Sequence, residues 1–156
     1  MTGTQVLTLT VAPPAWLTAN ARHLWPERAR RMKVLRHLTR VHARSLPLHP
    51  VTGPVVVTAQ ATYRAGRGID ADNIQPTVKA VLDGLTDAGI WPDDSGQHVA
   101  AVTYLPAVRD PSLQRGFHGL RVAITPSLSL IEAITATLNP AGGTPTPAPG
   151  TERNTQ

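Results

Sequence analysis

The stretch "GIDADNIQPTVKAVLDGLTDAGIWPDD", residues 68–94, contains the clearest helix of the chain and six of its ten acidic residues. Pro76 suits the first turn of a helix, and Gly89 suits the position just past its end. Four apolar residues recur between them at helical spacing: Val78, Val81, Leu82 and Leu85. This pattern predicts a helix over residues 76–90 that buries one face against the rest of the domain.

Strand-like and helical segments alternate on both sides of this helix. Strands are expected in four segments that alternate in polarity or are rich in β-branched residues: 4–13, 54–63, 98–108 and 119–126. Two further helices are expected over 26–46 and 127–138. The order β-α-β-α-β-β-α predicts an α+β domain, with helices packed on one face of a small, mixed or antiparallel four-stranded sheet.

The composition of the chain limits its expected cellular location and its domain organisation. Its 156 residues suffice for one domain, expected over 1–138, followed by a Pro/Gly/Thr-rich tail over 139–156 that we expect to be disordered. The absence of cysteine excludes disulfides and thiolate zinc sites. No apolar run is long enough for a membrane span, and the first residues do not resemble a secretion signal, so we expect a cytoplasmic protein without a membrane partner.

The chain is strongly basic, with a formal net charge of +5. This charge favours a polyanionic partner, either nucleic acid or an anionic membrane surface. The helix over 26–46 has an expected apolar stripe at a spacing of three, made by Met32, Leu35, Leu38 and Val41. Its basic residues Lys33, Arg36, Arg40 and Arg44 gather on another face. That face is either simply solvated or contacts phosphates, and the scarcity of acids on this helix favours phosphate contact.

Two acids, Asp70 and Asp72, lie two residues apart just before the central helix. If the backbone is extended there, both carboxylates leave the same face and repel each other unless a cation lies between them. Mg²⁺ is the simplest such cation, and it serves phosphodiester cleavage by orienting water and stabilising charge. The alternative is structural: the two acids cap a turn or pair with Arg64 and Arg67.

The longer pattern is more specific than the acid pair. "D-A-D-N", a helix bearing "K-A-V-L-D-G-L", and then "D-A-G-I-W-P-D-D" together resemble the RusA family of Holliday junction resolvases. These are small phage and prophage endonucleases that cut four-way DNA junctions using Mg²⁺. The stretch "APPAWLTANARHLWPERAR", residues 12–30, supports the resemblance more weakly.

The resemblance implies roles for individual residues. Asp70, Asp72 and Asp94 would be the metal-binding acids, and Lys79 would stabilise charge on the scissile phosphate. The chain departs from the compact motif because "IQPTV" separates Asn73 from Lys79. The alternative for Lys79 is an ordinary surface pair with Asp83, one turn further along the helix.

The length of the central helix constrains Asp94. Residues 76–88 span about 20 Å as a helix, and only a nearly extended segment from 89 to 94 could return that far. Either the segment that carries Asp94 therefore runs back along the helix, or Asp94 reaches Asp70 and Asp72 from a second subunit.

Taken together, these features predict a Mg²⁺-dependent endonuclease that resolves Holliday junctions by paired nicks, with Mn²⁺ as a possible substitute metal. Arg64 and Arg67 would hold a phosphate beside the metal, or else neutralise the two acids. A homodimer would match the two-fold symmetry of the junction. Two alternatives stay open: a non-catalytic DNA-junction-binding module, and a metal-dependent nuclease acting on other branched DNA or on RNA.

Overall fold

The computed structural model describes residues 3–126 and 128–138. Its elements in chain order are β1 (Gln5–Val11), α1 (Trp25–Ser45), β2 (Val55–Tyr63), the short 3₁₀ helix η1 (Ala71–Ile74), α2 (Gln75–Ala88), β3 (Val99–Arg109), β4 (His118–Pro126) and α3 (Leu128–Leu138). The predicted α+β class and all seven predicted elements are confirmed, and η1 is the addition. The predicted tail over 139–156 lies outside the described residues.

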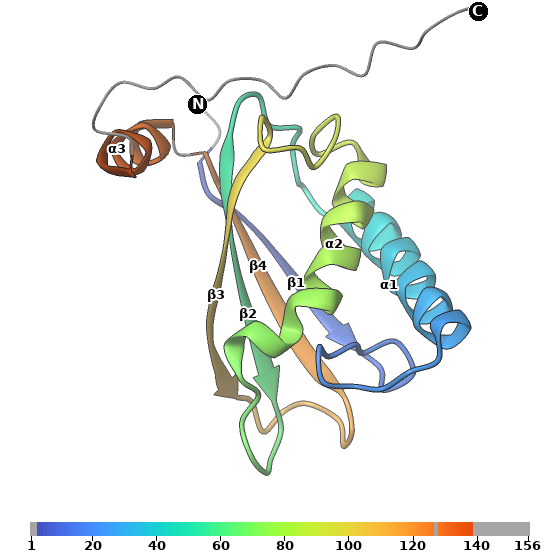
Figure 1. The fold of residues 1–156 in the computed structure, drawn as a ribbon. Coiled ribbons are helices and arrows are strands. Elements are labelled where there is room, and N and C mark those ends of the chain that lie inside the picture. The colour runs from blue at the N-terminus through green and yellow to red at the C-terminus, as the bar shows by residue number, and fades with distance from the viewer. Residues whose placement is uncertain (1–2, 127, 139–156) are drawn as a thin grey trace, which may run out of the picture.

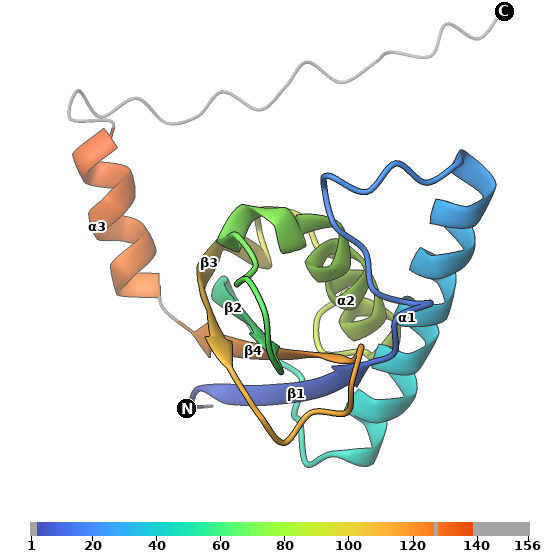
Figure 2. The same ribbon diagram turned by 90° about the horizontal axis from the view of Figure 1, so that it is seen from below.

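The four strands form one mixed sheet in the order β1-β4-β2-β3. β4 pairs antiparallel with both β1 and β2, whereas β2 and β3 are parallel. A parallel pair needs a long crossover connection, and here η1 and α2 supply it. Helices α1 and α2 lie side by side on one face of the sheet (Figures 1 and 2). Because β2 and β3 are parallel, their carboxyl ends reach the same edge of the sheet.

The core lies between this sheet face and α2. Val78, Val81 and Leu85 of α2 are fully buried, as the helical pattern predicts. In α1 the predicted apolar stripe is wrong in its second half, because Leu38 and Val41 are 47% and 53% exposed. The buried face of α1 instead follows a spacing of four through Leu35, Thr39 and Ala43.

Close approach of α1 to α2 explains this choice of face. A Cβ added to Gly84 of α2 would lie 2.6 Å from both the Arg36 carbonyl oxygen and Thr39 Cβ. Only a glycine leaves room for a helix at that distance. The buried Thr39 hydroxyl donates to the Leu35 carbonyl at 2.9 Å, so a polar side chain can occupy this contact without an unpaired group.

The chain reverses sharply after α2. Gly89 has a left-handed φ of 85°, and the Ile90 amide donates to the Leu85 carbonyl at 3.1 Å. Trp91 is buried, and its indole Nε1 donates to Thr86 Oγ1 at 2.8 Å. The segment after α2 therefore folds back on the helix far enough for Asp94 to contact Lys79. Within the described residues, this return does not join Asp94 to Asp70 and Asp72 in one group of carboxylates.

Candidate metal and DNA site

Asp70 and Asp72 lie on the crossover between β2 and α2. Asp70 occupies the position before η1, and Asp72 lies within that 3₁₀ helix. Because Asp72 is helical, the expectation that both acids leave one face of an extended segment is wrong. Both residues are exposed.

Neither carboxylate of this pair has a protein partner in the part of the chain that the structure describes. Among residues 3–126 and 128–138, no side-chain hydrogen bond caps η1 and no ion pair involves Asp70 or Asp72. The Arg64 guanidinium instead donates to the Leu113 carbonyl at 2.7 Å. The alternative in which the two acids cap a turn or pair with Arg64 and Arg67 is therefore not what the structure forms.

The turn that carries these acids is held by the loop before α1. The Ala19 amide donates to the Asn73 carbonyl at 2.9 Å, and the Asn20 amide donates to Asn73 Oδ1 at 3.1 Å. One turn into α2, Thr77 Oγ1 exchanges hydrogen bonds of 3.0 and 2.7 Å with the backbone of Leu17. The two stretches that carry the family resemblance are thus neighbours in space, although about fifty residues separate them in sequence.

Lys79 is held between two carboxylates on the exposed side of α2. Its ammonium donates to Asp83 Oδ1 at 2.8 Å and also contacts Asp94 Oδ2. The hydrogen bond to Asp83, and then the one to Asp94, raise the pKa of Lys79 above its usual value. The pair with Asp83 matches the structural alternative for Lys79, and Asp94 adds a partner that the sequence did not predict.

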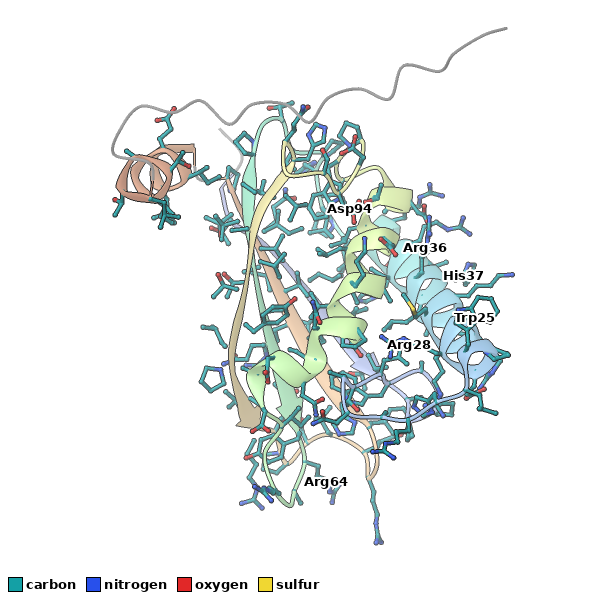
Figure 3. All side chains as sticks on the ribbon, viewed as in Figure 1. Trp25, Arg28, Arg36, His37, Arg64 and Asp94 are labelled. Carbon is teal, nitrogen blue, oxygen red and sulfur yellow. The ribbon has the colours of Figure 1, made fainter. Side chains whose placement is uncertain are left out.

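Within one chain, Asp94 accompanies Lys79 and not the acid pair. Asp72 precedes Lys79 by seven residues, which corresponds to about 10 Å along a helix axis. Among residues 3–126 and 128–138, no group of three or more His, Cys, Asp or Glu side chains is placed to hold a metal ion. Figure 3 shows Asp94 near the carboxyl-terminal half of α2, far from Arg64, which lies in the loop preceding Asp70.

The basic face of α1 is partly neutralised by α2. Arg36 Nη2 donates to Asp87 Oδ1 at 2.7 Å, and Arg44 Nη2 donates to the Asp87 carbonyl at 2.8 Å. Arg40 Nη2 lies 3.2 Å from His37 Nδ1. The acid that compensates this face, Asp87, comes from the neighbouring helix and not from α1 itself. A shallow pocket of about 380 Å³ remains here, lined by Lys33, Arg36, His37, Arg40 and Asp87 (Figure 3).

The ion pair between Arg36 and Asp87 predicts a pH dependence of stability. The Arg36 guanidinium holds the pKa of the Asp87 carboxyl below its usual value of 3.8. A lowered folded-state pKa stabilises the fold above pH 3.8, and this contribution is lost as the pH falls through the folded-state value. We expect Asp87→Asn to lower the midpoint of thermal unfolding at pH 7, with the difference from wild type shrinking below about pH 3.8. A difference that stays constant down to pH 2.5 would contradict this account.

Sequence reasoning did not single out two arginines: Arg109, at the end of β3, and Arg115, in the loop that follows it. Arg109 ends β3, and its Nε donates to the Arg64 carbonyl at 3.3 Å. The Asp110 amide donates to the Tyr63 carbonyl at 2.7 Å, which ties the following loop to the loop before Asp70. In the described structure, neither arginine pairs with a carboxylate. The parallel pairing of β2 with β3 was the signal that could have placed them.

Comparison with known proteins adds no relative: neither protein-family models nor curated proteins match the chain. Among the described residues, no helix is long and apolar enough to cross a membrane.

Proposed function

We propose that the chain is a Mg²⁺-dependent, structure-selective endonuclease that resolves four-way DNA junctions by paired symmetric nicks. One observation carries the proposal: Asp70 and Asp72, two residues apart in the sequence, are both exposed and lack any cationic or hydrogen-bonding partner among the described residues of a strongly basic chain. Unpaired carboxylates can bind a divalent cation, and carboxylate oxygens suit Mg²⁺. Asn73 contacts the loop over residues 12–24, so the two stretches on which the resemblance to RusA resolvases rests lie together in the fold.

The residues of this chain have separate tasks in the proposed reaction. Asp70 and Asp72 would hold the metal, which when bound polarises a phosphoryl oxygen and activates water; Mn²⁺ would be an effective substitute. Lys79 is protonated at neutral pH, hydrogen bonds to Asp83 and Asp94 raise its pKa further above the usual value, and its charge would stabilise the phosphate. A role for Asp94 as third ligand requires a second chain, because its own chain holds it at Lys79.

Substrate binding would rest on arginines near the acid pair. Arg64 and Arg67 precede Asp70, Arg109 donates to the Arg64 carbonyl, and Arg115 lies in the loop that follows β3. Such contacts orient DNA through its phosphates without reading its sequence. A homodimer would place two such sites on a two-fold symmetric junction, as paired nicks require.

A labelled synthetic four-way junction tests the proposal directly. With Mg²⁺ we expect symmetric nicks that disappear in EDTA and that excess linear duplex does not suppress. If forks, flaps or RNA were cleaved as efficiently as the junction, the chain would be a nuclease of broader specificity and not a junction resolvase. Sedimentation at the mass of a single chain on the junction would contradict paired nicking by a dimer.

A non-catalytic junction-binding module is the second candidate. One observation favours it: Lys79 is occupied by two carboxylates, and the described residues of a single chain form no three-carboxylate group. Tight junction binding without cleavage, across several divalent metals, would support this candidate and contradict the nuclease proposal.

A further inference from the structure

A groove of about 350 Å³ crosses the amino-terminal half of α2, and Lys79 is part of its lining. Arg28 of α1 contributes a second cation, and in Figure 3 its side chain lies between α1 and α2. The neighbouring Glu27 is occupied by Arg30 and Arg31, at 2.9 and 2.7 Å. Within the described residues the Arg28 guanidinium has no carboxylate partner, so its donors are available to a bound anion.

The remaining lining suits a flat, partly polar ring. Met32 and Leu82 supply apolar surface, and Tyr104 of β3 adds an aromatic ring. The Tyr104 hydroxyl is protonated at neutral pH and can donate a hydrogen bond, burial raises its pKa further, and no partner for it lies in the described structure. The exposed Gln75 side chain also makes no hydrogen bond to the described residues, so its amide offers one donor and one acceptor side.

We propose that this groove binds a single nucleotide of the DNA substrate, with its base out of the stack. The base would rest on Tyr104, Met32 and Leu82, its edge would meet the Gln75 amide, and Arg28 would hold its phosphate. The groove volume of about 350 Å³ falls within the range of small-molecule pockets, and a single nucleotide is a ligand of that size class. Aromatic side chains accept unstacked bases, and glutamine amides pair with base edges.

This inference rests on the proposed nuclease function and deepens it. Unstacking a base costs least where pairing is already disturbed, as at the branch point of a junction. A groove that contains Lys79 would therefore receive a nucleotide next to the scissile phosphate. Gln75 would then give the enzyme a preference for the base at that position, a property that phosphate contacts alone do not provide.

The test uses the four deoxynucleoside monophosphates and the ¹⁵N-labelled chain in EDTA, so it does not depend on cleavage. We expect saturable amide shifts around Gln75, Leu82 and Tyr104. Affinity should fall at least about fivefold in Tyr104→Ala and be retained in Tyr104→Phe, because the ring carries the stacking. Gln75→Ala, at an exposed position, should equalise the affinities of the four nucleotides, whereas Gln97→Ala at another exposed glutamine should not.

Two results would overturn the nucleotide site. The first is that inorganic phosphate reproduces all the shifts, which would reduce the groove to an anion site. The second is that the shifts centre on the pocket beside Arg36 and Asp87 and not on this groove. If the chain nicks junctions but gives either result, the proposed function stands and the nucleotide site in this groove is contradicted. If the chain binds nucleotides in this groove but does not nick junctions, the nucleotide site stands and the nuclease proposal is contradicted.

Discussion

Replacing Asp72 by asparagine is expected to lower Mg²⁺-dependent nicking of a four-way junction at least about a hundredfold, a typical effect of removing one electrostatic catalytic group. The substitution keeps the size of the side chain but removes the charge that would hold the metal. Junction affinity should not fall, because Asp72 contributes no positive charge to phosphate binding. Single-turnover nicking and electrophoretic mobility shifts in EDTA measure the two properties separately.

Asp110→Asn is the matched control for this variant. Asp110 lies on the neighbouring loop, but its carboxylate already accepts hydrogen bonds from the Ser112 amide and hydroxyl, at 3.0 and 2.6 Å. It is therefore satisfied without a metal, and its replacement should leave nicking nearly unchanged. If Asp72→Asn nicked junctions at the wild-type rate, Asp72 would not belong to the site. If both variants lost activity equally, the loss would reflect only a general effect of charge.

Gly84→Ala is expected to destabilise the fold by about 1–3 kcal/mol, the usual cost of overpacking a core contact. The added methyl group would lie 2.6 Å from the Arg36 carbonyl oxygen and from Thr39 Cβ. Two packed helices must separate to accept it, since the nearest atoms include backbone and cannot rotate away. Urea unfolding monitored by circular dichroism measures the change in the free energy of unfolding.

Gly96→Ala provides the control, because a Cβ at that position meets no atom within 4 Å. Its unfolding midpoint should match that of the wild type to within a few tenths of a kcal/mol. If Gly84→Ala were equally neutral, the close packing of α1 on α2 would not be as described.

The fold was largely predictable because its signals are local. Strands follow alternation, and α2 begins and ends near Pro76 and Gly89, where the sequence predicts. The buried face of α1 was not predictable in the same way. The hydrophobic pattern predicts that Leu38 and Val41 are buried. The helix instead buries Thr39 and Ala43, because Gly84 on another helix allows close contact there. That preference depends on a partner 45 residues away in sequence.

The candidate site was predictable only where its residues adjoin in the chain. Asp70, Asp72 and Lys79 were singled out from one window, together with Asp83 as a possible partner of Lys79, but the ion pairs between separate elements were not. The pairs Arg36–Asp87 and Lys79–Asp94 form only when α1 docks on α2 and when the chain turns back at Gly89. Arg109 reaches the site through strand pairing, which the spacing of residues along the chain does not reveal.

The central claim is that Asp70 and Asp72 hold the metal, and paramagnetic broadening by Mn²⁺ tests it without reference to activity. Substoichiometric Mn²⁺ is added to the ¹⁵N-labelled chain, and the loss of each amide signal is followed. We expect the amides of residues 70–73 to broaden first, and Asp72→Asn to abolish this effect. Broadening centred on Asp83, Asp87 and Asp94, with residues 70–73 unaffected, would contradict the account.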